Sequence, residues 1–228
     1  VFYLTPELKK LLADQRKAAN RLQRQKGMIV QHVFFHDGTT QTFSMVDRGY
    51  GGYVFQASIN DHGTVAGTAS CDSPSDFCNF AFVYRDGKVT TPPIRIGDFG
   101  EVSQINNRGQ IVGKYYSYWD GDRRAFLRQH GVTVELFPDA TDSAAYGIND
   151  SGQITGYTSS HGGYVGYVYR EGQVRLLGEL EPGGGSIGRA INRWGHVTGE
   201  ARVGTKTHAF RYRNGVMTDL GVLGNGDD

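Results

Sequence analysis

Apolar residues recur in short alternating runs between glycine-containing turns along most of this chain, and one such pattern returns four times. Its fixed part reads Ile-Asn-x-x-Gly-x-Val/Ile-x-Gly. The asparagines of the four copies are Asn60, Asn106, Asn149 and Asn192, which lie 46, 43 and 43 residues apart. Since a fixed period of about 20 to 50 residues is typical of repeat architectures, the spacing predicts a repeat protein.

The fixed part predicts a β-hairpin. Asparagine at the first position and glycine at the fourth position of a turn favour a type I turn, in which the asparagine side chain can bond the backbone two residues further on. Apolar residues flank the turn on both sides. We call this the first hairpin of each module.

A second hairpin is predicted about 14 residues later in each copy. Its turn carries Asp-Gly or Asn-Gly in two copies, which favour a type I′ turn because both central residues need positive φ. The four segments are 81–87, 125–131, 166–172 and 209–215. Each module is therefore expected to contain four strands.

A partial module precedes the four complete ones. Residues 33–38 and 40–46 form a second hairpin, but no Ile-Asn-x-x-Gly segment stands before them. The chain also stops after Leu220 to Asp228, where a further first hairpin would start. The expected repeats are 28–54 (half), 55–101, 102–144, 145–187 and 188–228.

These repeats predict an all-β fold, a five-bladed β-propeller with one incomplete blade. Units of four strands suit a propeller, because radial packing leaves only short protected sheet edges. Both chain ends would then build the fifth blade. The alternative is an open β-solenoid or a stack of hairpins.

Residues 1–27 predict a separate amphipathic α-helix before the β-repeat domain of residues 28–228. Thr5, Pro6 and Glu7 suit a helix start. Leucine and alanine then form one stripe, and Gly27 suits the helix end, so we expect the helix over 6–26. It could lie on a membrane or a partner, or dock on the repeat domain.

The charge distribution argues against nucleic acid as a partner. The net charge is +1, but residues 1–27 hold seven Lys/Arg and two acids, which leaves 17 basic and 21 acidic residues in the repeats. Nucleic-acid binding is expected to need clustered positive charge. No apolar run approaches the roughly 20 residues that span a bilayer. Without an initiator Met or signal peptide, the chain is expected to be a mature or excised product.

The two cysteines, Cys71 and Cys78, lie at the ends of one short polar loop of the first complete module. Two thiols so placed predict a disulfide that staples the loop and favours an oxidising compartment. The alternative is a pair of free surface thiols.

The loops between the two hairpins of a module vary in length, whereas the tight turns hardly do. Because binding residues tend to lie on variable loops of a rigid scaffold, we expect the ligand there. The aromatic segment 115–124 is the main candidate, although alternate aromatic residues could instead pack inward. The predicted ligand-binding residues are Tyr115, Tyr116, Tyr118, Trp119, His161 and Tyr164.

No residue pattern predicts a catalytic, cofactor or metal site. Asp61 and Asp150 follow the turn asparagine, but Asn107 and Arg193 replace them in the other copies, which argues against a repeated calcium site. The histidines are dispersed and show no His-Glu-x-x-His spacing.

The two linked motifs, with His208-Ala-Phe210 in the last copy, resemble the bacterial probable extracellular repeats of the HAF type over residues 32–228. This resemblance implies a secreted, cell-surface or periplasmic protein. His-Ala-Phe is literal only in the last repeat, so the histidine is not expected to be a chemical requirement of the fold.

Three function hypotheses follow. The first is a non-enzymatic extracellular binding or adhesion module that holds a glycan or a protein or peptide ligand. The second is a structural unit that assembles or self-associates. The third is a carbohydrate-active enzyme that uses paired loop carboxylates.

Overall fold

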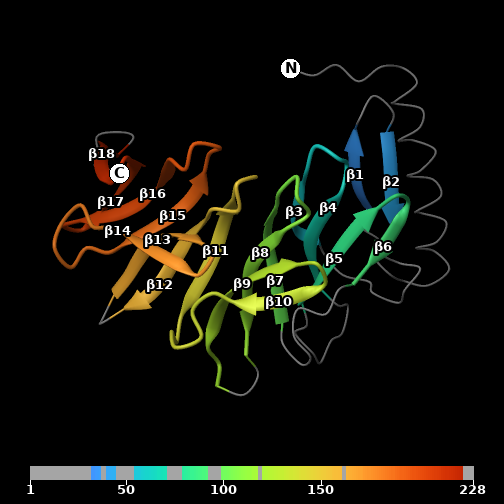
Figure 1. Cartoon of the computed structure of the whole chain (residues 1–228), viewed down its shortest axis with the longest axis horizontal. Coiled ribbons are helices and arrows are strands. Elements are labelled where there is room, and N and C mark those ends of the chain that lie inside the picture. Colours follow the sequence, from blue (N-terminus) through green and yellow to red (C-terminus); the bar gives the residue numbers. More distant parts are fainter. Residues whose placement is uncertain are drawn as a thin grey trace.

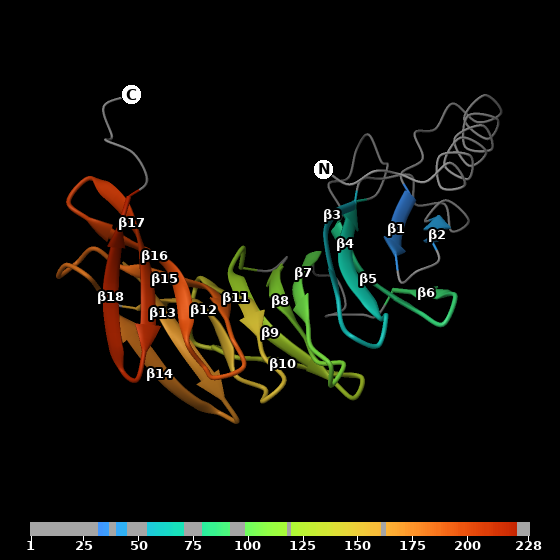
Figure 2. The ribbon, with the colours of Figure 1, turned by 90° about the horizontal axis from the view of Figure 1, so that it is seen from above.

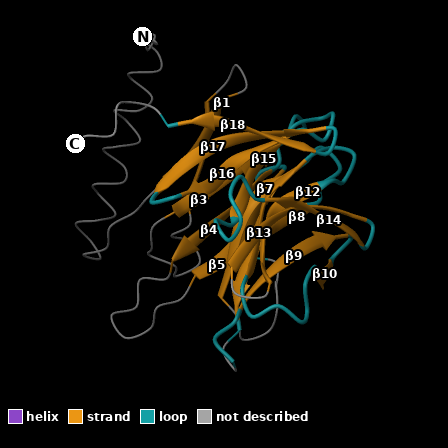
Figure 3. Cartoon of the chain, turned by 90° about the vertical axis from the view of Figure 1, so that its left-hand side faces the viewer, coloured by secondary structure: helices purple, strands orange, loops and turns teal. Residues whose placement is uncertain are grey.

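The computed structural model describes residues 32–36, 40–44, 54–70, 79–91, 99–117, 120–160 and 163–222. Every regular element in these ranges is a strand (Figure 3). The strands are β1 (His32–His36), β2 (Thr40–Ser44), β3 (Val54–Ile59), β4 (Val65–Ser70), β5 (Asn79–Arg85), β6 (Lys88–Thr90), β7 (Phe99–Ile105), β8 (Ile111–Tyr116), β9 (Arg123–Gln129), β10 (Val132–Glu135), β11 (Ser143–Ile148), β12 (Ile154–Ser160), β13 (Gly163–Arg170), β14 (Gln173–Gly178), β15 (Ser186–Ile191), β16 (Val197–Val203), β17 (Lys206–Arg213) and β18 (Val216–Gly221). The predicted helix over 6–26 lies outside the described residues.

The strands form four antiparallel four-stranded sheets, and in each sheet the strands pair in chain order. The sheets are β3–β6, β7–β10, β11–β14 and β15–β18, which we call blades one to four. Strands β1 and β2 form a two-stranded sheet. The predicted all-β fold with two hairpins in each module is thereby confirmed.

The blades follow one another along an arc (Figures 1 and 2). The β1–β2 sheet lies at one end of the arc beside blade one, and blade four lies at the other end. The described strands therefore form an open array of blades. A closed ring of five blades stays a prediction.

Both predicted turns are confirmed. In the first hairpin of blade one, the Asn60 Oδ1 accepts hydrogen bonds from the amides of His62 at 3.1 Å and Thr64 at 3.0 Å. In the second hairpin, Asp86 and Gly87 have φ angles of 50° and 76°, as a type I′ turn requires. His130, Glu171 and Asn214 adopt the same positive φ in the other blades.

The last glycine of the repeat motif is fixed by a close approach of two strands. A Cβ atom at Gly156 would overlap the carbonyl oxygen of Ala144 in the neighbouring strand of the same blade. Gly67, Gly113 and Gly199 meet the corresponding carbonyl in their own blades. Glycine therefore stands here because only a residue without a side chain fits.

Adjacent blades share apolar cores. Between blades one and two, Ala66 and Ala81 pack in one cluster with Ile105 and Phe126. The next two junctions have their own clusters, which bury Tyr167 and Phe210. These aromatic rings are 0 % exposed, so the largest side chains of the repeats are used for packing between blades.

A chain of asparagine side chains also joins the blades. The Nδ2 of Asn60 donates to the backbone carbonyl of Asn106 at 3.0 Å. Asn106 donates in the same way to Asn149, and Asn149 to Asn192, both at 2.9 Å. We call these four residues the asparagine ladder. All four side chains order their own turns through Oδ1, and the first three also contact the next blade through Nδ2, which needs both an acceptor and a donor.

Candidate functional site

Each blade has two ends. The tight turns of both hairpins lie at one end, which we call the turn end. The loop between the hairpins and the link to the next blade lie at the other, which we call the loop end. Of the predicted ligand-binding residues, the described ones, Tyr115, Tyr116 and Tyr164, belong to the loop end of blades two and three.

The loop between β8 and β9 is closed by its own backbone. The amide of Ser117 donates to the carbonyl of Asp122 at 2.9 Å, and the amide of Gly121 donates to the carbonyl of Ser117 at 3.0 Å. Gly121 has a φ of 74°, which favours glycine at this position. The residues on either side of positions 118 and 119 are therefore held together.

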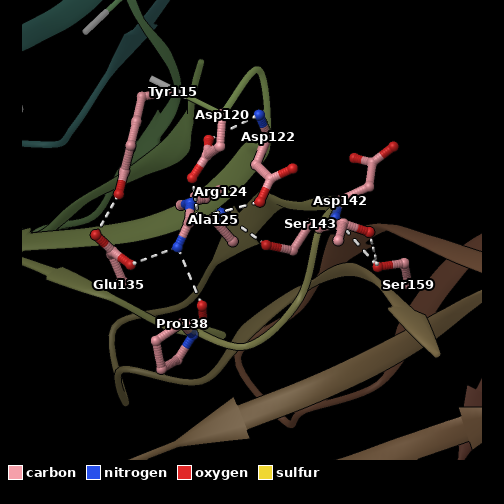
Figure 4. Close-up of polar contacts among 11 residues, drawn as sticks. Tyr115, Asp120, Asp122, Arg124, Ala125, Glu135, Pro138, Asp142, Ser143 and Ser159 are labelled. Carbon is pink, nitrogen blue, oxygen red and sulfur yellow. Dashed lines mark hydrogen bonds and ion pairs between the residues drawn. The ribbon is translucent and has the colours of Figure 1, made fainter. Parts of the chain in front are cut away.

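Arg124 anchors this loop to the sheet (Figure 4). Its guanidinium lies 2.6 Å from a carboxylate oxygen of Asp120, 3.0 Å from Asp122 and 3.4 Å from Glu135. It also donates to the carbonyl of Pro138 at 3.0 Å. We call Arg124 and the three acids the Arg124 cluster. Its positive charge is paired with three acids, so the cluster offers no unpaired cation to an anionic ligand.

Hydrogen bonds hold the carboxylate of Asp120 in its charged form. The pKa of Asp120 is lowered by hydrogen bonds from the Ser117 side chain and the Asp122 amide. The nearby charge of Arg124 lowers it further. The carboxylate is therefore an acceptor at neutral pH. It lacks the raised pKa that a general acid would require.

A second polar group connects blades two and three. Asp142 forms an ion pair with Arg123 and accepts hydrogen bonds from the hydroxyl of Tyr157 at 2.8 Å and of Tyr164 at 3.1 Å. Its amide donates to Ser159 Oγ at 3.1 Å. We call these five residues the Asp142 cluster. The Tyr157 and Tyr164 rings meet edge to face with centroids 4.9 Å apart.

Burial and the carboxylate of Asp142 raise the pKa of Tyr157 well above the ordinary phenol value. The hydroxyl therefore stays protonated and remains a donor to Asp142. This makes the cluster a positioning device rather than a source of protons.

The described members of the predicted ligand-binding set differ in how far their side chains are exposed. Tyr115 is 1 % exposed, lies in the core between blades one and two, and bonds Glu135 through its hydroxyl. This placement agrees with the packing alternative and leaves Tyr115 almost no surface for a ligand. Tyr116 is half-buried, and the ammonium of Lys114 lies 6.0 Å from its ring centroid. Tyr164 is 44 % exposed.

Tyr116 and Tyr164 are linked through the ion pair between Arg123 and Asp142. Tyr116 is paired across the sheet with Arg123, and Arg123 contacts Asp142, which holds Tyr164. Five further predicted residues fall outside the described residues, so their predictions stay open. They are Tyr118, Trp119, His161 and the two cysteines, Cys71 and Cys78.

Sequence reasoning missed the roles of Arg123, Arg124 and Asp142. Arg124 pairs with Asp120 and Asp122 of the same segment but also with Glu135 of β10, and Arg123 pairs with Asp142 in the link before β11. The acids and the two adjacent arginines of this segment were the only local signal. Nothing local pointed to Asp142.

The turn end carries a hollow of about 460 Å³ between blades three and four. Its lining includes Arg170, Arg175, Trp194 and His196. Trp194 is 66 % exposed, and the guanidinium of Arg193 lies 4.2 Å from its ring centroid. Sequence reasoning did not favour this end, because turn lengths hardly vary there.

Two features are absent from the described part of the chain. No group of three or more His, Cys, Asp and Glu side chains in it is placed to hold a metal ion. None of its elements is a helix long and apolar enough to cross a membrane.

Comparison with solved structures places this arrangement of blades among the β-propellers. TolB from Acinetobacter baumannii aligns with a TM-score of 0.56 and 13 % identity, over 92 % of this chain and 58 % of that one. The β-propeller domain of the Trilobed protease from Pyrococcus furiosus, which has an open velcro topology, aligns with a TM-score of 0.55 and 10 % identity, over 80 % of this chain and 54 % of that domain's chain.

Dipeptidyl peptidase 4 from Porphyromonas gingivalis aligns with a TM-score of 0.53 and 10 % identity, over 84 % of this chain and 36 % of that one. No protein-family model and no curated protein matches the sequence. The chain is therefore a β-propeller domain by fold. It spans between 36 % and 58 % of the length of these three structures, and at such low identity the likeness shows the fold alone.

Proposed function

We propose that this β-propeller domain is a non-catalytic binding module that holds a neutral glycan at the loop end of blades two and three. The observation that carries the proposal is the Arg124 cluster, which fixes the aromatic loop to the sheet. A binding surface held in place before the ligand arrives loses less entropy on binding.

The charges at this end argue against an anionic ligand. Arg124 already contacts three acids and Arg123 contacts Asp142, so both arginines are paired and carboxylates are in excess. Exposed tyrosine rings with polar neighbours offer an apolar face and hydrogen-bonding groups together. Tyr164 and Tyr116 are the described residues proposed to contact the sugar rings, with Tyr118, Trp119 and His161 beside them in the sequence.

We also propose that the domain acts outside the cytoplasm, at the cell surface, where glycans are displayed. This step rests on the resemblance to the extracellular repeats and on the predicted Cys71–Cys78 disulfide. Thiol labelling of the denatured, non-reduced protein tests the disulfide. Two reactive thiols would contradict it.

For the architecture, we propose that β1–β2 is the outer half of a fifth blade. Ile59 supports this idea, because it is 51 % exposed whereas its counterpart Ile105 is 4 % exposed. Ile105 packs with Ala66 in the preceding blade, and a half blade without its first hairpin offers no such strand to Ile59. Class averages from electron microscopy would show whether the particle is a five-bladed ring.

A glycan array probed with the whole chain, with a peptide array beside it, tests the function. We expect binding to neutral glycans that Tyr164→Ala and Tyr116→Ala each weaken about tenfold, as loss of one aromatic contact does. Trp194→Ala is the matched control, because it removes an exposed aromatic ring from the turn end. Binding to peptides alone, or loss of binding only in the Trp194 variant, would contradict the proposal.

A further inference from the structure

Blade four has one face that no other blade covers in the described chain, and the first three blades show what such a face normally contacts. In each of them, the corresponding face packs against the first strand of the next blade. On blade three this strand is β15, which contacts β11, β12 and β13. We call this side of any blade its trailing face.

The trailing face of blade four keeps the residues that accept such a strand. On blade three, the strand passes over Gly147, Thr155 and Gly156, and a Cβ at Gly188 of β15 would overlap the Thr155 hydroxyl. The counterparts on blade four are small as well: Ala190, Thr198 and Gly199. A hollow of about 330 Å³ lies there, lined by Thr198, Gly199 and Ala209 among others.

Exposure changes sharply between matched positions. Thr155 is 0 % exposed, whereas Thr198 is exposed. Leu136 and Leu177 are 6 % and 5 % exposed, whereas Leu220, their counterpart before the last bulge of the sheet, is 57 % exposed. Burying a side chain of this size against a following blade would be favourable, because it removes apolar surface from water.

The polar contacts of the junction also end at blade four. Asn149 donates to the carbonyl of Asn192 in the next blade, but among the described residues the Nδ2 of Asn192 has only the ring nitrogen of His196 at 3.5 Å. In addition, Ser143 and Ser186 each accept a bond from a backbone amide of the preceding blade, at 2.9 Å and 3.0 Å. The corresponding amide on blade four belongs to Ala209.

We propose that the trailing face of blade four is a docking site for a further first hairpin of this same repeat. The hairpin would carry serine six residues before its ladder asparagine, as Ser143 stands before Asn149 and Ser186 before Asn192. Its serine accepts from the amide of Ala209, its ladder asparagine offers a carbonyl to Asn192, and its first strand covers the hollow. The asparagine bond occurs at all three junctions inside the chain, and the serine contact occurs at two of them.

The outer part of the face favours a hairpin over a second copy of the whole chain. Arg211 stands where Leu127 and Val168 stand in the preceding blades, and it is exposed. In blade three, Val168 packs with Tyr212, which belongs to the second hairpin of the next blade. A second copy would also have to place its blade one against this face. The core of blade one, with Phe82 and Tyr84, is already buried within its own chain.

The test extends the full chain with a second copy of residues 141–187 joined after Asp228. In the chain itself, Leu220→Ser should leave the unfolding equilibrium constant nearly unchanged. In the extended chain it should raise that constant on the order of a hundredfold, as loss of a buried leucine does. Leu177→Ser is the matched control and should be damaging in both chains.

Hydrogen exchange keeps the test decisive if the added module folds poorly. Docking should slow the exchange of amides in β16 and β17 of the extended chain, and unchanged exchange would overturn the proposal. A neutral Leu220→Ser in the extended chain would overturn it as well. So would a dimer of the original chain that Leu220→Arg dissociates, because a second copy would then occupy the face. None of these results depends on glycan binding.

Discussion

Blades three and four share the repeat motif and its two turns, but in the described chain only blade three is covered by a neighbouring blade on both sides. Asn149 is 6 % exposed, whereas Asn192 is exposed, although both order the same turn through two backbone amides. Leu177 and Leu220 differ in the same way. The comparison teaches that the module builds its own turns and sheet, while the next blade determines the burial of its trailing face.

The largest expected effect on stability is at the other end of the arc, in blades one and two. Ile105→Ala should lower the free energy of unfolding by about 2–5 kcal/mol, because the side chain is 4 % exposed and its loss leaves a cavity between blades. Ile59→Ala should cost no more than about 1 kcal/mol, because Ile59 is 51 % exposed. Urea unfolding of both variants measures the difference. Equal losses would mean that Ile59 has a buried contact of the same kind.

The asparagine ladder offers an isosteric test of the same comparison. In Asn149→Asp, the carboxylate still accepts from its own turn but cannot donate to the Asn192 carbonyl, so stability at pH 7 should fall by about 1–3 kcal/mol. Asn192→Asp removes no donor to a following blade and should change stability by less than about 0.5 kcal/mol. Thermal unfolding of the two variants decides between them. A similar loss in both would show that the ladder bonds contribute little.

The serine contacts should give a smaller effect. Ser143 is 0 % exposed and its Oγ accepts from the amide of Ala125 across the junction of blades two and three. Ser143→Ala should therefore cost about 1 kcal/mol. Ser151→Ala, in an exposed turn position, is the control and should be nearly neutral. If the two variants unfold at the same urea concentration, this contact does not stabilise the junction.

The smallest effect is expected at the edge of blade four, where Asp219 takes the position that Glu135 holds in blade two. Bonds from the Gly221 amide and the His208 side chain lower the pKa of Asp219. A carboxylate with a lowered folded pKa stabilises the fold above its unfolded pKa, and this contribution is lost as the pH falls below about 4. Asp219→Asn should slightly weaken the acid dependence of the melting temperature. An unchanged pH profile would contradict this contribution.

Much of the fold could be predicted from local patterns. The Asn-x-x-Gly and Asp-Gly turns were predicted correctly because their chemistry lies within a few residues, and Asn60 and Gly87 adopt the expected geometry. The candidate site could be predicted only in part. Tyr115 and Tyr164 both lie at the loop end, but one is buried and the other is 44 % exposed.

The sequence alone determined the four-stranded module, its period and the direction of each turn, because these depend on residues that are neighbours in the chain. Only the tertiary structure decided which surfaces of the module are covered. Thr155 and Thr198 occupy the same place in the repeat, but a following blade covers only Thr155. It also decided that Arg123 pairs with Asp142 and that Nδ2 of Asn149 bonds the next blade. Such contacts join residues far apart in the sequence, where local propensity carries no information.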